Sequence, residues 1–373
     1  MAKHRRFNVD RFLDKFQKRE SILRNYLLKW KEQLGVSLED LDVPAIKEIF
    51  GSGNTDALDE VFEGLYRAYD MCTDPGHEQL IASCATFEYD PDPDGRLPVE
   101  CLSVKVLTER PDVFDLAYDL NTLLQAERFT IYRGPKAAVI PDVATAADRF
   151  QAKLGETFKG DKDSDRVLVR HYQEGQRTNL IVYHEKRTKA ELVFRGNRGH
   201  LRVTPTTFRP AQQDFISYDQ TLGQVEIEAR SEKEEAELRR AFAATCLGAA
   251  DFFDGADAAK RLELGKIAEK AFDMSVDEVD TARLVELHFK FPQKHGPRFV
   301  VASKDVLETL DLTELRRALS GAVIQRAVFN IAFRGEKRGK RVELSGSNSI
   351  KFKRATHADA IFRYLRNWKI LLG

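Results

Sequence analysis

Two stretches near the middle of the chain, Val167-Leu-Val-Arg-His-Tyr172 and Asn179-Leu-Ile-Val-Tyr-His184, decide the fold class. Four similar runs follow at residues 190–195, 200–204, 214–218 and 224–230. The runs are rich in β-branched or aromatic residues, and most alternate apolar with polar residues, as strands with one buried face do. Turn-forming residues, among them Gly175 and Pro210, separate them. The sequence therefore predicts a mostly antiparallel β-sheet at the centre of the protein.

The part of the chain before this sheet is predicted to be mainly helical. Asn8 can cap a helix that runs to residue 34, in which Phe16, Leu23 and Trp30 lie on one apolar stripe, and Gly35 ends it. Packing within its own domain is favoured over a coiled coil, because two to three heptads are too few for one. Further helices are expected at 43–50, 56–71, 77–86, 112–125 and 144–154, and strands at 99–107 and 128–133.

Helices and strands also follow the central sheet. Ser231 and Glu234 form a capping box that begins a helix, and Thr356 to Asp359 is expected to cap the last one. A helix is predicted at 256–272, two short helices at 305–310 and 313–320, and strands at 283–291, 298–302, 322–333 and 341–344. The predicted fold is α+β in three parts: a helical and mixed domain (1–155), an antiparallel sheet flanked by helices (166–280), and a small basic module (281–373).

Charge is balanced over the chain but segregated along it. The 373 residues contain 59 Lys+Arg and 59 Asp+Glu. Residues 1–36 have a net charge of +6, from ten basic and four acidic residues. Residues 37–100 have −13, from three and sixteen, and residues 334–373 have +8, from eleven and three. Such segregation marks either a partner surface or two parts of the chain that attract each other.

The sequence favours a cytoplasmic protein with no membrane contact. Four cysteines in 373 residues do not form a disulfide framework. The basic N-terminus, Met1-Ala-Lys-His-Arg-Arg6, lacks the apolar run of a signal peptide. No stretch approaches eighteen uninterrupted apolar residues.

Metal and cofactor sites are not expected. Cys72, His77, Cys84 and Cys101 have zinc-ligand chemistry, but their spacing fits no compact zinc motif. The loop Asp90-Pro-Asp-Pro-Asp-Gly95 resembles the first half of an EF-hand loop. Its twelfth position, however, is Cys101 where calcium needs Glu. Two glycine-rich segments, at 51–56 and 335–340, match no complete phosphate-binding loop.

One short motif keeps an enzymatic alternative open. His184, Lys186 and Glu191 satisfy the HxKxxxxD/E pattern and so resemble phospholipase D-like phosphodiesterases. That resemblance implies a strand histidine that attacks phosphorus and a lysine that holds the phosphate oxygens. The alternative interpretation is an exposed polar turn of a hairpin. No other catalytic arrangement has support, so a non-catalytic protein is favoured.

The C-terminal basic cluster carries the main functional prediction. Arg334, Lys337, Arg338, Lys340 and Arg341 gather on one turn between two strands, and Lys351, Lys353 and Arg354 follow. Two short helices before a strand, a basic turn and a strand resemble the order in the back half of a winged helix. That resemblance implies that the second helix, with Arg316 and Arg317 exposed, enters a groove while the turn grips phosphate.

Two interpretations of this cluster remain open. The first is nucleic-acid binding through Arg316, Arg317, Arg334, Lys337, Arg338, Lys340, Arg341, Lys351 and Lys353. The second is an adaptor without a nucleic-acid role, because a basic turn can also dock onto an acidic surface such as residues 37–100 of the same or a second copy. Self-association or partner binding through residues 1–100 belongs to this second interpretation.

Overall fold

The chain divides into two compact units, Met1–Gln125 and Ala126–Gly373. The structure is a computed structural model, and it describes residues 7–35, 37, 41–52, 56–162, 164–195, 202–269, 272–277, 280–292, 295–311, 317 and 321–372. The division differs from the predicted ranges 1–155, 166–280 and 281–373. The physical reason is strand pairing, because strands from all three predicted parts share one sheet.

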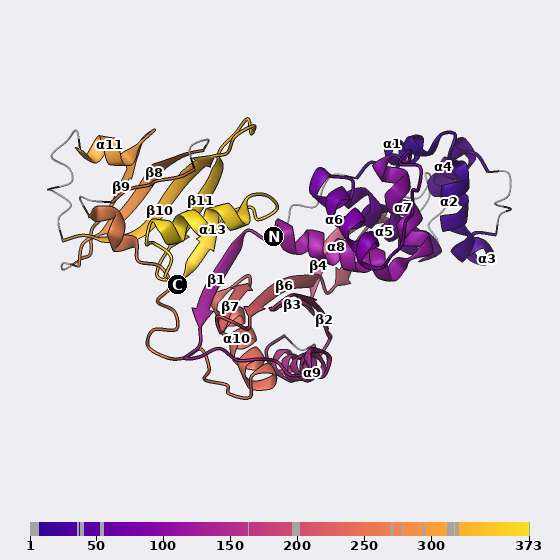
Figure 1. The fold of residues 1–373 in the computed structure, drawn as a ribbon. Coiled ribbons are helices and arrows are strands. Elements are labelled where there is room, and N and C mark those ends of the chain that lie inside the picture. The colour runs from indigo at the N-terminus through magenta and orange to yellow at the C-terminus, as the bar shows by residue number, and fades with distance from the viewer. Residues whose placement is uncertain are drawn as a thin grey trace. The chain divides into compact units, whose positions relative to one another are not determined.

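The first unit is helical in its described residues (Figure 1). Its core combines apolar side chains from most of these helices, including Phe16, Leu65, Leu80 and Phe114. The elements are α1 (Val9–Leu13), η1 (Asp14–Phe16), α2 (Glu20–Leu27), η2 (Leu28–Trp30), α3 (Lys31–Leu34), α4 (Val43–Ser52), α5 (Asp56–Asp70), α6 (Asp74–Thr86), α7 (Val99–Glu109) and α8 (Pro111–Gln125).

The predicted N-terminal helix is broken into segments. Asn8 caps α1 as expected, since its side chain accepts a hydrogen bond from the Arg11 N–H at 3.0 Å. Lys18 then takes a left-handed φ of 67°, which interrupts the helix between η1 and α2. Gly35, at φ 63°, ends α3 as predicted. Phe16, Leu23 and Trp30 are all buried in the core of the first unit, so the apolar stripe packs within its own unit.

The predicted strand at 99–107 is wrong, because this segment is the helix α7. Cys101, Leu102, Ser103, Val104 and Val106 are all buried, so almost the whole circumference of the helix is covered. A short apolar run that is buried on every side has the same periodicity in a helix as in a central strand.

The second unit contains a ten-stranded antiparallel sheet among its described residues, in the order β2-β3-β6-β7-β1-β12-β11-β10-β8-β9. With the surrounding helices this confirms the α+β fold class. The strands are β1 (Arg128–Arg133), β2 (Val167–Glu174), β3 (Arg177–Glu185), β6 (Ala211–Asp219), β7 (Gln224–Glu228), β8 (Thr281–Lys290), β9 (Arg298–Ala302), β10 (Val323–Ala332), β11 (Lys340–Ser345) and β12 (Ser349–Lys351).

Two of the six strands predicted at the centre are not part of this sheet. β4 (Lys189–Arg195) and β5 (Arg202–Phe208) pair only with each other and form a separate two-stranded ribbon. The start of the predicted strand at 200–204 lies outside the described residues. β3 and β6, which flank the ribbon in sequence, pair directly from Arg177↔Asp219 to Glu185↔Ala211. The ribbon is therefore an excursion from the β3–β6 hairpin.

Strand β1 separates two hydrophobic cores on opposite faces of the sheet. Ile131 belongs to the core formed with α13 (Ala358–Asn367), α11 (Val306–Asp311) and η3 (Leu264–Ala268). The next residue, Tyr132, packs against the core formed with α9 (Val143–Lys162) and α10 (Glu232–Cys246). Successive strand residues point to opposite faces. Each half of the sheet is thus covered by helices on a different side (Figure 1).

The helix boundaries in this unit were predicted with mixed success. Ser231 caps α10 as expected, and its hydroxyl oxygen accepts the Glu234 N–H at 3.2 Å. The predicted helix at 256–272 is wrong for most of its length, since only the 3-10 helix η3 forms there among the described residues. α13 begins after His357, whose φ is 62° and whose side chain makes no capping hydrogen bond, so the predicted cap at 356–359 is also wrong.

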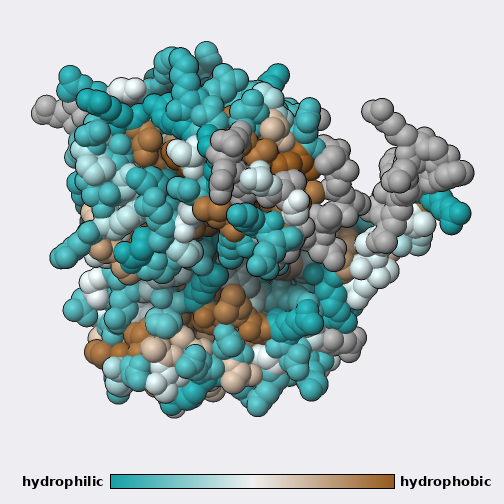
Figure 2. Space-filling view, turned by 90° about the vertical axis from the view of Figure 1, so that its right-hand side faces the viewer, coloured by the Kyte–Doolittle hydropathy of each residue, from teal (hydrophilic) through white to brown (hydrophobic). Residues whose placement is uncertain are grey.

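The face of the molecule seen in Figure 2 is mostly hydrophilic, and its hydrophobic residues form separate patches. Among the helices of the described ranges, none is both long enough and apolar enough to span a membrane.

Candidate nucleic-acid interface

The basic turn predicted from sequence is the connection between β10 and β11, here called the basic hairpin (residues 334–341). The two strands pair from Arg326↔Ser345 to Ile331↔Lys340, and the connection projects beyond the end of the sheet (Figure 1). Gly335 has a φ of 84°, a conformation that disfavours L side chains, and a Cβ there would meet open space. Glycine is therefore required at this position by the backbone and not by crowding.

The carboxylate of Glu336 is engaged within the hairpin. It lies 3.1 Å from Lys340 Nζ and 2.9 Å from His357 Nε2. The imidazole of His357 stacks on Phe333 with a centroid distance of 3.9 Å. Burial favours a higher pKa for Glu336, but the hydrogen bonds from Lys340 and His357 outweigh it and hold the pKa below its usual value. Glu336 thus fixes the base of the hairpin to the start of α13.

Three other cations of the hairpin have no neutralising partner among the residues that the structure describes. Arg334, Lys337 and Arg338 are exposed, and within the described ranges their side chains have no carboxylate partner. The Arg334 backbone N–H donates to Asp280 at 3.2 Å, which holds the start of the turn. Lys340 is bonded to Glu336, so the free positive charge concentrates at Arg334 and at the tip residues 337–338.

The fifth hairpin cation, Arg341, belongs to a polar sheet face that sequence analysis did not recognise. Its Nη2 lies 2.9 Å from Glu286 Oε2, and the other oxygen of Glu286 lies 2.6 Å from His288 Nε2. Arg326 lies 2.8 Å from Glu343 and 3.8 Å from Glu286. The register places Arg283 beside Asn330 and Arg341 on the same face. The polar sheet face is defined by Arg128, Arg283, Glu286, His288, Arg326, Asn330, Arg341, Glu343 and Lys351.

Alternation within the predicted strands could have revealed this face. Arg283 and Arg326 adjoin Leu284 and Ala327, which are buried in the core on the other side. The register of β8 against β10, however, shifts between Ile324 and Arg326 and again between Val328 and Phe329. These irregularities change the alternation, so the sequence alone does not align the charged residues of the two strands.

Two further predicted residues lie close to this face. Lys351, in β12, is exposed and sits opposite Arg128 of β1 and Glu343 of β11 in the register. Lys353 follows β12 and is also exposed. The described ranges contain no ion pair for either lysine. Both are therefore available to an anionic ligand.

Arg354 continues the basic run in sequence, but its side chain is not available to an anionic ligand. Its side chain is 11% exposed and its Nη1 lies 2.5 Å from the buried carboxylate of Glu226 on β7. Its guanidinium lies 3.5 Å from the centre of the Phe129 ring and near Phe352 and Phe362. Nε and Nη2 have no hydrogen-bond partner in the described residues, consistent with an arginine held mainly by one carboxylate and aromatic faces.

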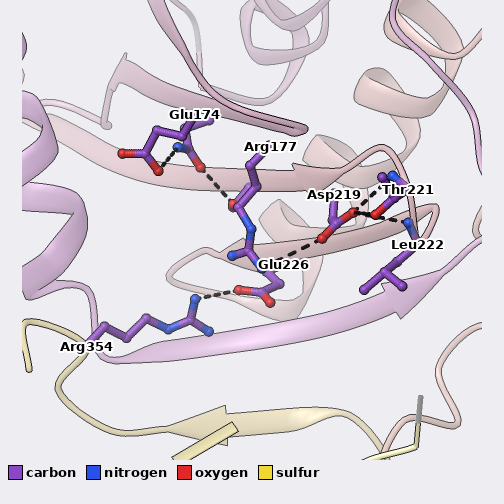
Figure 3. Close-up of polar contacts among 9 residues, drawn as sticks. Glu174, Arg177, Asp219, Thr221, Leu222, Glu226 and Arg354 are labelled. Carbon is purple, nitrogen blue, oxygen red and sulfur yellow. Dashed lines mark hydrogen bonds and ion pairs between the residues drawn. The ribbon is translucent and has the colours of Figure 1, made fainter. Parts of the chain in front are cut away.

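The Glu226–Arg354 pair extends a row of polar contacts across β3, β6 and β7 (Figure 3). Arg177 Nη2 lies 3.9 Å from Asp219, whose other bonds secure Thr221 and Leu222 in the turn before β7. Burial favours a higher pKa for Glu226, but the charges of Arg354 and Arg177 outweigh it and hold the pKa below its usual value. The pair joins the segment after β12 to the other half of the sheet, which is a structural role.

The structure describes part of the predicted winged-helix unit. Arg316 and most of the predicted helix at 313–320 lie outside the described residues. Arg317 is described and its side chain is exposed. The strand–turn–strand unit exists as β10–β11, although β10 also pairs with β8 inside the large sheet. The recognition-helix role of Arg316 and Arg317 therefore stays a prediction.

The three residues of the phosphodiesterase-like motif, His184, Lys186 and Glu191, differ widely in the exposure of their side chains to solvent. His184 is the penultimate residue of β3, and its side chain is 0% exposed. Its Nε2 lies 2.8 Å from Asp214, and its ring packs on Phe158. Lys186 is partly exposed after β3, and Glu191 lies on the separate ribbon. An imidazole closed in this way cannot attack phosphorus unless the strand end opens.

The residues considered for metals lie in the helical unit. Cys84 and Cys101 are buried in α6 and α7, and burial raises the pKa of each thiol to about 11. Cys72 donates to the Ala68 carbonyl at 3.2 Å. In the loop at 90–95, an oxygen of Asp92 accepts the Leu97 N–H at 2.7 Å. Over the described ranges, no group of three His, Cys, Asp or Glu residues could hold a metal ion.

Comparisons with models of protein families and with curated proteins find no match to the chain.

Proposed function

We propose that the chain is a non-catalytic intracellular protein that binds nucleic acid through the basic hairpin and the adjacent lysines 351 and 353. The observation that carries the proposal is the set of exposed cations without carboxylate partners in the described residues: Arg334, Lys337, Arg338, Lys351 and Lys353. Such cations neutralise phosphate groups and so release the counterions condensed on the nucleic acid. This release supplies a large share of the binding free energy.

The paired cations contribute differently to this proposal. Lys340 and Arg341 already interact with Glu336 and Glu286, so a phosphate must compete with a carboxylate for them. Phosphate contacts position a protein on nucleic acid but do not read its sequence. The hairpin therefore supports binding that depends on salt and tolerates many sequences.

Fluorescence anisotropy over a salt series tests the proposal with duplex DNA, single-stranded DNA and RNA. For duplex DNA, the variant Arg334→Ala/Lys337→Ala/Arg338→Ala should flatten the slope of log K against log salt by roughly 2–3, because three phosphate contacts are lost. A Lys340→Ala/Arg341→Ala variant should change the slope less, because both cations are ion-paired in the free protein.

A matched control removes the same charge from a helix far from the hairpin in the same unit. Arg149, Lys153 and Lys159 are exposed on α9, and their replacement by alanine should leave the slope unchanged. Equal slopes of log K against log salt for the hairpin variant and the wild type would contradict the proposal. Absence of binding to all three nucleic acids would favour the adaptor interpretation, in which the same cations meet an acidic protein surface.

A phosphodiesterase remains the enzymatic alternative, and the buried position of His184 weighs against it. Turnover of a chromogenic phosphodiester by the wild type, lost in His184→Ala, would reverse this preference.

A further inference from the structure

The β4–β5 ribbon is separate from the main sheet and exposes apolar side chains to solvent. Seven residues on each strand pair in register from Lys189↔Phe208 to Arg195↔Arg202. At about 3.3 Å per residue the paired segment is about 23 Å long. An isolated two-stranded ribbon is only marginally stable in water. Because it is separate from the main sheet, the outer edge of each of its two strands pairs with no third strand in the described residues.

The ribbon and its flanks are strongly basic. Residues 186–209 contain seven Lys or Arg against one Glu, a net charge of +6. Lys189 and Arg202 are exposed, and the described residues contain no ion pair for either. Burial, and then the neighbouring charges of Arg230 and Lys189, hold the pKa of Lys186 below its usual value.

One face of the ribbon is also apolar and exposed. The register places Leu192 opposite Pro205 and Ala190 opposite Thr207 on the same face, and these four residues are all exposed. Leu192 is 74% exposed, and Val203, which follows on that face, is 54% exposed. Exposed apolar side chains within a basic element indicate a surface that a partner covers. The charge requires that this partner be anionic.

Duplex DNA combines the required properties. Its major groove is about 12 Å wide and admits an α-helix or a two-stranded β-ribbon. Phosphates on both sides of the groove would meet cations along the ribbon, while apolar side chains can contact the methyl groups of thymine. The major groove of duplex RNA is too narrow for side chains to read.

We propose that the β4–β5 ribbon inserts into the major groove of duplex DNA with the Leu192–Val203 face toward the bases. Lys189 and Arg202 leave the opposite face of the ribbon and reach the phosphates at the edges of the groove. This inference rests on the proposed function, because both require nucleic acid as the partner. It adds a second contact surface, and it names duplex DNA as the preferred ligand.

Methylation protection with the full chain tests the groove assignment. Dimethyl sulfate methylates guanine N7, which lies in the major groove. At saturating protein on a short duplex, the wild type should protect N7. The variant Leu192→Ser/Val203→Ser should lose this protection, whereas the hairpin variant Arg334→Ala/Lys337→Ala/Arg338→Ala should keep it when saturated. As a control, Phe299→Ser/Val300→Ser changes exposed apolar residues of β9 and should keep it too.

The charge contribution is measured separately. Lys189→Gln/Arg202→Gln should flatten the salt slope on duplex DNA by about 2, and duplex RNA should compete poorly with DNA. Circular dichroism and urea unfolding verify that each variant is folded. Unprotected N7 in the bound wild type, unchanged protection and slopes in the ribbon variants, or equal competition by duplex RNA would overturn the inference.

The outcomes separate this inference from the proposed function. One outcome is that the hairpin variant alters the salt slope while the ribbon variants change neither the N7 protection nor the salt slope. In that case only the ribbon inference is wrong. If the wild type binds no nucleic acid, both fall.

Discussion

The buried ion pair between Glu226 and Arg354 shows that Arg354 has a structural role, although the neighbouring Lys351 and Lys353 suggest a phosphate-binding one. Arg354 follows Lys351 and Lys353 in a basic run of the sequence that predicts an exposed surface. Its side chain instead packs on the Phe129 ring and bonds to the carboxylate of Glu226, which lies 128 residues away in sequence. A buried pair of this kind costs desolvation on both sides. Removing one partner is therefore more disruptive than replacing both.

Glu226→Gln should lower the free energy of unfolding at neutral pH by about 3 kcal/mol, because the Arg354 charge stays buried without a counter-charge. The lowered pKa of folded Glu226 means that its contribution is present above the unfolded value of about 4.3 and is lost as pH falls through the folded value. The difference from wild type should therefore shrink on acidification, since protonated Glu and Gln are both neutral. Urea unfolding at several pH values measures this.

Two controls accompany this measurement. Glu156→Gln breaks an exposed pair with Lys153 on α9 and should cost at most about 0.5 kcal/mol. Glu226→Met/Arg354→Met should recover part of the loss, because no unpaired charge remains. A Glu226→Gln variant as stable as wild type would show that the pair contributes nothing.

At the scale of elements, local sequence signals predicted many helix ends and strands. Asn8, Gly35 and Ser231 act at helix ends as their chemistry requires. β1 has the predicted bounds. The wrong assignment of α7 arose because its residues are buried on nearly every side, so no exposed face marks the helical period.

Ser231→Ala should destabilise the second unit by about 1 kcal/mol, since the Glu234 N–H at the start of α10 loses its acceptor. α10 packs on the core through Leu238 and Phe242, so the loss should appear in cooperative unfolding of that unit. Urea denaturation followed by circular dichroism provides the measurement. Ser231→Asp keeps an acceptor and should remain near wild type; equal stability of Ser231→Ala and wild type would contradict the capping role.

At the scale of the whole molecule, the chain folds as two units with separate hydrophobic cores. The first core contains residues from Phe12 to Ala117, and both cores of the second unit begin after residue 125. The predicted three-part organisation placed both of its boundaries, after residue 155 and after residue 280, inside the second unit. Pairing of β1 with β7 on one side and with β12 on the other unites the sheet across both boundaries.

Fragments 1–125 and 126–373 should therefore each fold when produced separately, because each retains its own core. Circular dichroism should show a mainly helical first fragment and a second with β-sheet signal, each with a cooperative thermal transition. Under the proposed function, the second fragment should also retain the salt-dependent binding of the full chain. A fragment without a cooperative transition would show that its core depends on the other unit.

The amino-acid sequence was sufficient to predict the α+β class, most strands, several helix caps and the cluster of cations at residues 334–341. These features depend on residues close together in the chain, through periodicity, capping chemistry and local charge. It was not sufficient to predict the strand order, the separation of the β4–β5 ribbon, or which cations are neutralised. Arg341 meets Glu286 and Arg354 meets Glu226 only because folding brings together strands far apart in sequence. Pairing between distant strands depends on complementary faces and shared burial, and neither is encoded within a single strand.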